Sequence, residues 1–219
     1  MAVPQVSGAV IEELLPYEQL QALWPKRVLD FLLSAVLLTL LALPMAIVAV
    51  LIKLDSRGPV LFGQRRIGLG GEEFTLYKFR SMRQGNDQGV HLRQSARWFE
   101  GTPGAEGFKP VRDPRITRLG GLLRKSSIDE LPQLINVLKG EMSLVGPRPL
   151  MPYDRPMYKD WYFERERMTP GITGLWQVSG RDRLSAETMM RLDARYVRTW
   201  SMVLDLKIIF LTVPALLGR

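Results

Sequence analysis

Residues 118–150 read RLGGLLRKSSIDELPQLINVLKGEMSLVGPRPL, and the rest of the chain can be organised around this stretch. Two adjacent carboxylates, Asp129 and Glu130, lie between a basic segment and a rigid Gly-Pro-Arg-Pro turn. A carboxylate can act as a nucleophile or a metal ligand, and neighbouring cations neutralise an anionic substrate. The stretch therefore indicates phosphate chemistry. The cations of the basic segment are Arg118, Arg124 and Lys125.

A short helix is predicted over residues 131–139, because its leucine and isoleucine side chains recur at helical spacing. Gly140 stands where a C-terminal cap belongs. Pro132 is tolerated only in the first turn, so the helix must begin close to Asp129 or Glu130. Both acids are then expected at a helix N-terminus, where free amides and the helix dipole also favour bound anions.

The carboxylate pair also has a purely structural interpretation. Asp129 could be a helix N-cap, or Ser127 and Glu130 could form a capping box, each worth roughly 1 kcal/mol. The two interpretations are compatible, since a capped helix end can also hold phosphate. The spacing alone leaves both open.

An apolar run without charged residues extends from Phe31 to Ile52. Its 22 residues would make a helix about 33 Å long, enough to cross a bilayer. Pro44 lies inside the run and predicts a kink. Lysine and arginine flank both ends, which by the positive-inside rule places both ends in the cytoplasm. A re-entrant helical hairpin satisfies both observations; an ordinary kinked transmembrane helix is the alternative. The flanking cations are Lys26, Arg27, Lys53, Arg57, Arg65 and Arg66.

The composition excludes several classes of site. The 219 residues include no Cys, so disulfides, thiolate metal sites and cysteine nucleophiles are absent. His91 is the only His, which argues against zinc sites and Ser-His-Asp triads. The net charge of +8 suits nucleic acid, anionic lipid or a polyphosphate substrate. The apolar run favours lipid and substrate, and no nucleic-acid-binding module is recognised.

After Asp55 the mixed composition is that of a globular domain. Val60 to Phe62 and Phe74 to Phe79 predict strands joined by a glycine-rich turn. Lys78 and Arg80 then lie at the end of the second strand, on a basic edge that either faces solvent or faces the site.

Helices are also expected after this hairpin. One is predicted around residues 91–99 and another over 184–200. Residues 200–217 predict an amphipathic helix on the membrane interface, with a core helix as the alternative. Trp176 and Gln177 either border the site or pack.

The string SSIDELPQLINVLKGEMSLVGPRPL, with YKFRSM before it and PGITGLWQVSGR after it, closely resembles the bacterial sugar transferase family. These are monotopic polyprenyl-phosphate phosphoglycosyl transferases, which begin polysaccharide and glycoconjugate assembly. The resemblance runs from about Lys26 to the C-terminus. It implies an α+β, mostly helical fold, with a re-entrant kinked membrane helix, a short β-hairpin and interface-lying amphipathic helices. Leu43 departs from the serine that often precedes the kink proline in this family.

The resemblance also implies transfer of a sugar-1-phosphate from a UDP-sugar to undecaprenyl phosphate, with release of UMP and with Mg²⁺ as cofactor. Asp129 would attack the β-phosphorus and carry the sugar phosphate covalently. Glu130 would hold the metal. The remaining expected roles are substrate phosphate binding by Arg124, Arg80 and Lys78, nucleotide-sugar binding by Arg148, Pro147 and Gly146, support from Asp205 and Gln177, and the membrane kink at Pro44.

The predicted division is an N-terminal lead-in over 1–25, a re-entrant membrane helix over 26–54 and a cytosolic catalytic domain over 55–219. The expected location is the cytoplasmic face of the bacterial inner membrane, in contact with lipid and compatible with a homodimer. Two alternatives stay open: direct single-step transfer with Asp129 as general base, and a non-catalytic membrane-surface binding protein. The sequence does not name the sugar, whose recognition is expected in 84–110 or after Pro149.

Overall fold

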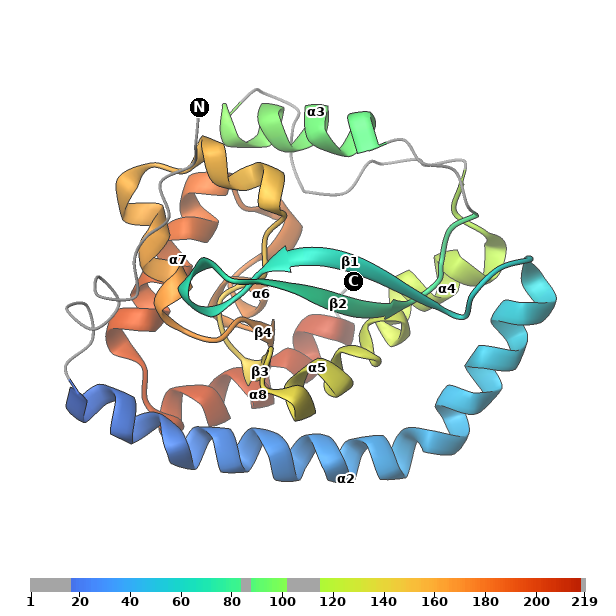
Figure 1. The fold of residues 1–219 in the computed structure, drawn as a ribbon, viewed down its shortest axis with the longest axis horizontal. Helices are drawn as coiled ribbons and strands as arrows, with labels where there is room; N and C mark the ends of the chain where they lie inside the picture. The colour runs from blue at the N-terminus through green and yellow to red at the C-terminus, as the bar shows by residue number, and fades with distance from the viewer. Residues whose placement is uncertain (1–16, 84–87, 102–114, 218–219) are drawn as a thin grey trace.

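The computed structural model describes residues 17–83, 88–101 and 115–217. Its longest element is helix α2, Tyr17–Asp55, which contains Pro44. The helix runs along one side of the molecule, and its lighter-blue C-terminal part turns away from the line of the rest (Figure 1). Among the described residues it is the one helix long and apolar enough to cross a membrane, and little of its apolar window is buried.

An antiparallel hairpin of β1, Leu61–Ile67, and β2, Glu73–Phe79, follows α2. The predicted hairpin is therefore confirmed, with a first strand longer than expected. Its turn contains the short 3₁₀ helix η1, Leu69–Gly71. Side chains directly opposite each other share a face of the sheet, so Arg66, opposite Phe74, and Lys78, opposite Phe62, point to the same side.

Helix α3, Gln88–Phe99, lies across the hairpin from α2 (Figure 1). After it come α4, Arg118–Ser126, the 3₁₀ turn η2, Ile128–Glu130, and α5, Gln133–Lys139. Gly140 ends α5 with φ 86°, as its predicted capping role requires.

A second, parallel pair of strands was not predicted. Strand β3, Ser143–Val145, pairs with β4, Gly171–Thr173. The backbones approach so closely that a Cβ on Gly171 would collide with the backbone nitrogen of Gly146. This pairing fixes the start of the Gly-Pro-Arg-Pro turn, because Gly146 directly follows β3.

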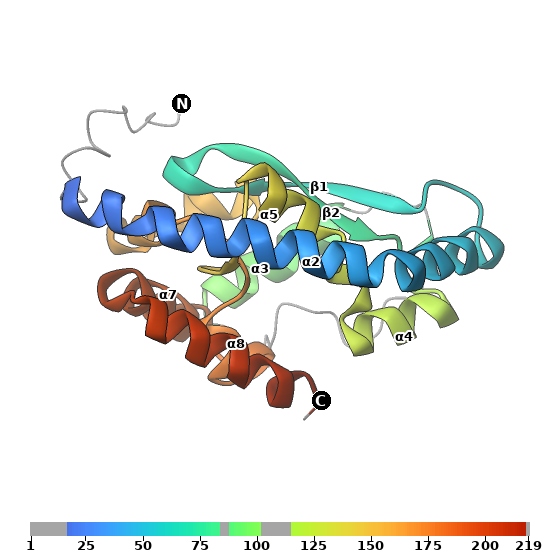
Figure 2. The ribbon, with the colours of Figure 1, turned by 90° about the horizontal axis from the view of Figure 1, so that it is seen from below.

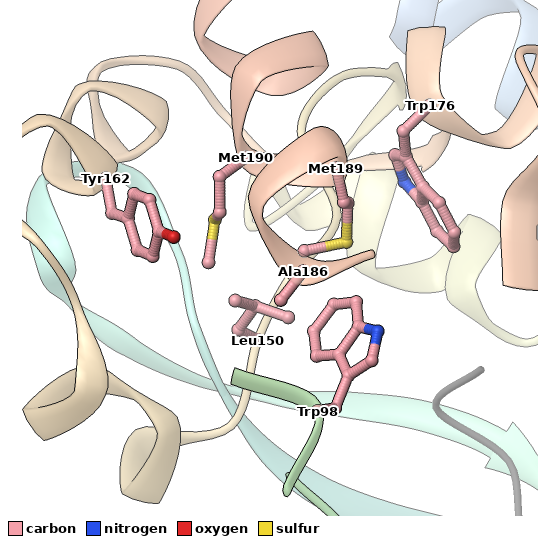
Figure 3. Packing of buried hydrophobic residues seen from close by; sticks show 7 residues of the cluster. All are labelled: Trp98, Leu150, Tyr162, Trp176, Ala186, Met189 and Met190. Atoms are coloured by element: carbon pink, nitrogen blue, oxygen red, sulfur yellow. The ribbon is translucent and has the colours of Figure 1, made fainter. Parts of the chain in front are cut away.

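A hydrophobic core surrounds Leu150, the residue that follows the Gly-Pro-Arg-Pro turn. Leu150 is buried between Trp98 of α3 and the methionines of α7, Ala186–Thr199 (Figure 3). Short helices supply the remaining members of this cluster: η3, Pro152–Met157, leads into η4, Asp160–Arg167, which contributes Tyr162, and α6, Leu175–Val178, contributes Trp176. A further 3₁₀ turn, η5, Arg181–Arg183, precedes α7.

Helix α8, Met202–Leu217, presents two different faces. Asp205 and Ile208 are buried against the body, whereas an apolar row at helical spacing is exposed. Phe210 in this row is 80% exposed. The helix diverges from α2 on the lower side of the molecule in Figure 2. The exposed row is Val203, Leu206, Phe210 and Val213.

The expected fold class is confirmed in its coarser form: the protein is mostly helical, with little sheet and one long apolar helix. The helices expected around 91–99, 184–200 and 200–217 correspond to α3, α7 and α8. Of the predicted lead-in, residues 1–16 lie outside the described residues, as do 84–87 and 102–110 of the segment expected to recognise the sugar.

Candidate active site

The carboxylate pair occupies its own 3₁₀ turn between α4 and α5. Ser127 reverses the chain here in the left-handed conformation, with φ 59°. Asp129 is buried to 8% exposure, and Glu130 accepts a hydrogen bond from Lys78 Nζ of β2 at 2.9 Å. The turn thus presents its acids to the inner face of the hairpin.

The expectation that the acids start the following helix is wrong in detail. The N-cap of α5 is Pro132, which makes no side-chain cap, and Ser127 makes no side-chain cap for η2. The capping interpretations of Asp129 and of Ser127 with Glu130 are therefore not supported. Proline provides the start of α5 with its fixed φ instead.

The predicted phosphate ligands differ in their surroundings. Arg124 lies in the last turn of α4, and its Nη1 contacts Met82 Sδ at 3.6 Å. Arg80 is buried directly after β2, and its Nη2 donates to the carbonyl oxygens of Ile52 at 3.2 Å and Ser56 at 2.6 Å. Arg80 thus neutralises the C-terminal end of α2. Its role toward phosphate stays a prediction.

The Gly-Pro-Arg-Pro turn is held by an ion pair that sequence reasoning missed. Arg165 of η4 pairs with Asp193 of α7 at 2.5 Å, and both side chains are buried. Asp193 accepts a hydrogen bond from the backbone nitrogen of Arg148, and Arg165 donates one to the backbone carbonyl oxygen of Arg148. The guanidinium of Arg148 lies over the ring of Trp176, 5.1 Å from its centroid. The backbone of Arg148 is therefore fixed on both sides.

Burial has the largest effect on the pKa of Asp193. Burial raises this pKa to about 6, while the guanidinium of Arg165 and the backbone of Arg148 lower it. Asp193 is thus mostly ionised at neutral pH, where it pairs with the charged guanidinium of Arg165.

Arg66 is a second residue whose buried position sequence reasoning missed, because it was interpreted only as a charge flanking the apolar run. Its side chain is buried, and its Nη1 donates to the carbonyl oxygen of Pro149 at 3.0 Å. Strand periodicity could have revealed it, since one of the adjacent residues Arg65 and Arg66 must face inward.

Asp205 of α8 is buried and binds the N-terminal part of α2; its expected support of the site stays a prediction. It accepts hydrogen bonds from Lys26 Nζ at 2.5 Å, Tyr196 Oη at 2.6 Å and Trp200 Nε1 at 3.2 Å. Lys26 also donates to the carbonyl oxygen of Val145, directly before Gly146, at 2.9 Å. The network therefore connects α2, α8 and the base of the Gly-Pro-Arg-Pro turn.

Arg27 adds to this attachment of α2. Arg27 donates to the carbonyl oxygens of Val137 and Leu138 at the end of α5, the latter at 2.7 Å.

Gln177 is buried and donates to the carbonyl oxygen of Ile172 at 3.4 Å, which favours the packing interpretation of this residue.

The fit of Mg²⁺ follows from the donor set. Within the described ranges, no group of three or more acidic or histidine side chains could hold a metal ion. Proteins usually bind Mg²⁺ through one or two carboxylates together with substrate phosphates and water. Glu130, next to Asp129, provides that kind of partial set. The residues present therefore fit a metal shared with a diphosphate.

A buried carboxylate beside a Glu–Lys pair, in a protein with a long apolar helix, fits one class of protein: membrane-associated enzymes that act on phosphates. Comparison with known families specifies it. The model of the family "Bacterial sugar transferase" matches residues 21–219. The chain belongs to the bacterial sugar transferase family and is a phosphoglycosyl transferase, as predicted from its motifs.

Three relatives illustrate the similarity. The exopolysaccharide production protein ExoY of Sinorhizobium fredii is 40% identical over 195 residues, 87% of this chain and 84% of ExoY. The undecaprenyl-phosphate glucose phosphotransferase of Komagataeibacter xylinus is 45% identical over 86% of this chain and 35% of the relative. The UDP-glucose:undecaprenyl-phosphate glucose-1-phosphate transferase of Xanthomonas campestris pv. campestris is 41% identical over 89% and 39%. This chain thus spans most of the first relative but well under half of the other two.

Proposed function

We propose that this protein transfers a sugar-1-phosphate from a UDP-sugar to undecaprenyl phosphate and releases UMP. The names of the Komagataeibacter and Xanthomonas relatives support the general reaction. The observation that carries the proposal is the position of Asp129: a buried carboxylate beside the Glu130–Lys78 pair, in a turn facing a hairpin that bears arginines.

In the first half-reaction an Asp129 carboxylate oxygen attacks the β-phosphorus of the donor. A new oxygen–phosphorus bond forms, and the bond from the β-phosphorus to the oxygen bridging to the α-phosphate breaks. UMP leaves with that bonding pair, and the sugar phosphate stays on Asp129 as an acyl phosphate. A carboxylate nucleophile thereby divides one displacement between two bulky anions into two steps.

In the second half-reaction a phosphate oxygen of undecaprenyl phosphate attacks the same phosphorus. The bond to Asp129 breaks, the carboxylate is regenerated, and the diphospholipid leaves. Lys78 keeps Glu130 oriented beside the nucleophile, at 2.9 Å. Arg148 on its rigid turn is assigned to the nucleotide side, where a preordered guanidinium can bind phosphate at low entropic cost.

Glu130, next to Asp129, would hold Mg²⁺, and the ion would neutralise negative charge on the diphosphate. Lys78, which donates to Glu130 Oε1, would share this carboxylate with the ion. Arg124 and Arg80 are assigned to the remaining phosphate charge.

We place the protein at the cytoplasmic face of the bacterial inner membrane, with α2 entering and leaving on the same side. Residues near both ends of its apolar run support this topology, because they contact one folded body. Arg27 binds the end of α5, whereas Ile52 binds Arg80 beside β2. A straight crossing would carry the two ends to opposite faces of the bilayer. The exposed apolar row of α8 gives the same body a second surface for lipid.

This placement brings a soluble donor and a lipid acceptor to one site, since the acceptor phosphate lies at headgroup level. The reaction would be the first membrane step of polysaccharide or glycoconjugate synthesis. A homodimer remains compatible with this arrangement.

The test is UMP release from a panel of UDP-sugars, with Mg²⁺ and undecaprenyl phosphate, by the full chain in nanodiscs. Wild type should release UMP with at least one donor, and Asp129→Asn should not. No release with any donor would contradict the proposed function. An unchanged cellular phenotype for Asp129→Asn would favour the binding-protein alternative, and sequential kinetics without an adduct would favour single-step transfer.

A further inference from the structure

Arg66 faces the interior of the protein, although its neighbour on β1 faces solvent. The Arg65 side chain is 63% exposed and pairs with Glu73 at 3.2 Å. Arg66 is 4% exposed and lies on the face that also carries Lys78, the partner of Glu130. The strand thus turns one of two adjacent arginines inward and leaves the other in solvent.

Among the described residues, Arg66 has no carboxylate partner, although its guanidinium is buried. Its guanidinium donates to two neutral acceptors, Gln64 Oε1 at 2.7 Å and the carbonyl oxygen of Pro149 at 3.0 Å. Its Nε finds no hydrogen-bond partner among the described residues, and no carboxylate there lies within ion-pair distance of it. An unpaired buried charge is costly. Two other buried cations have a carboxylate partner, Lys26 with Asp205 and Arg165 with Asp193, whereas buried Arg80 donates to the carbonyl oxygens at the end of α2.

Arg66 lies near a second guanidinium and within the electrostatic influence of two carboxylates. Burial lowers its pKa to about 10, and the positive charge of Arg148 adds to the lowering. The carboxylates of Asp154 and Glu130 act in the opposite direction. Arg66 thus remains charged at neutral pH, close to a second guanidinium and within electrostatic reach of Glu130. A bound phosphate would relieve the repulsion between the two arginines.

We infer that Arg66 is a further ligand of the donor's diphosphate, contacting the β-phosphate between the nucleotide side at Arg148 and the carboxylate turn at Glu130. The inference rests on the proposed function, because it assigns a part of the same donor. A charge-assisted hydrogen bond of this kind corresponds to about tenfold or more in affinity.

The experiment measures binding of UDP and of UMP, each with Mg²⁺, to the full chain in nanodiscs by calorimetry. The variants are Arg66→Gln and Arg65→Gln, which change adjacent arginines on opposite faces of one strand. Arg66→Gln should weaken UDP binding about tenfold or more and UMP binding much less, so the ratio of the two affinities falls. Arg65→Gln should bind both as wild type does.

The ratio separates ligand contact from a structural role. Loss of the hydrogen bond to Pro149 would weaken UDP and UMP by the same factor, and an unchanged ratio would overturn the assignment. If Arg66→Gln does not fold, Arg66→Lys serves instead, since it keeps the charge but not the several donors of a guanidinium. If wild type binds neither UDP nor UMP, the proposed function itself is refuted. If wild type binds UDP but Arg66→Gln has the same ratio of UDP to UMP affinity, only the role of Arg66 is refuted.

Discussion

Replacing Asp193 by alanine should destabilise the protein strongly, because the change leaves Arg165 buried without its partner. Both side chains are almost fully buried and lie 2.5 Å apart. Removing one partner of such a pair typically costs about 3–5 kcal/mol. At about 2–4 °C per kcal/mol for a chain of this size, Tm should fall by roughly 6–20 °C.

The double variant Asp193→Leu with Arg165→Met separates stability from function. It should be more stable than Asp193→Ala, since no unpaired charge remains buried. It should stay poorly active, because neither side of the Arg148 backbone is then held. Thermal unfolding in detergent and UMP release measure the two properties, with Arg191→Gln, in an exposed pair with Glu187, as the control. A Tm for Asp193→Ala within 2–3 °C of wild type, roughly 1 kcal/mol or less, would refute this account of the turn.

Three further predictions concern the same body. The pKa of Asp193 is about 6 in the folded protein but near 4 in the unfolded chain, so the folded state binds more protons between these values. The contribution of Asp193 to the free energy of unfolding should therefore fall as pH rises from about 4 to about 6. The difference in Tm between wild type and Asp193→Asn should change across this pH range and level off above it. Gly171→Ala should abolish folding or activity, because its Cβ collides with the backbone of Gly146; a wild-type Tm would contradict the close approach of the strands. Lys26→Met should lower Tm by several degrees by stranding the buried Asp205, and protease sensitivity of the start of α2 should rise; unchanged values would show that the pair does not anchor the helix.

Local signals explain what the sequence could predict. The hairpin, the helices and the cap at Gly140 depend on periodicity and on turn residues a few positions apart. The carboxylate pair was found by its position between basic residues and a proline-rich turn. Its 3₁₀ turn was not predicted, because nothing local distinguishes Ser127, whose left-handed conformation is rare for a residue other than glycine.

Long-range contacts explain what was missed. Arg148 meets Asp193 across 45 positions, and strands of three residues such as β3 carry too little pattern to recognise. Lys26 and Arg27 were interpreted only as topology signals. In the structure they also bind Asp205 and the end of α5, so the same charges serve the fold. A charge run in a sequence does not show which members turn inward.

The central claim is that Asp129 carries the sugar phosphate covalently. The most direct measurement is intact mass after rapid acid quenching of the full chain mixed with Mg²⁺ and an active UDP-sugar, without undecaprenyl phosphate. We expect wild type to gain the mass of one sugar phosphate, located by peptide mapping on Asp129, and to lose it when the acceptor is added. Asp129→Asn should gain nothing, while Arg65→Gln should behave as wild type. Turnover of wild type with no adduct at any quench time, or an adduct that persists in Asp129→Asn, would contradict the account.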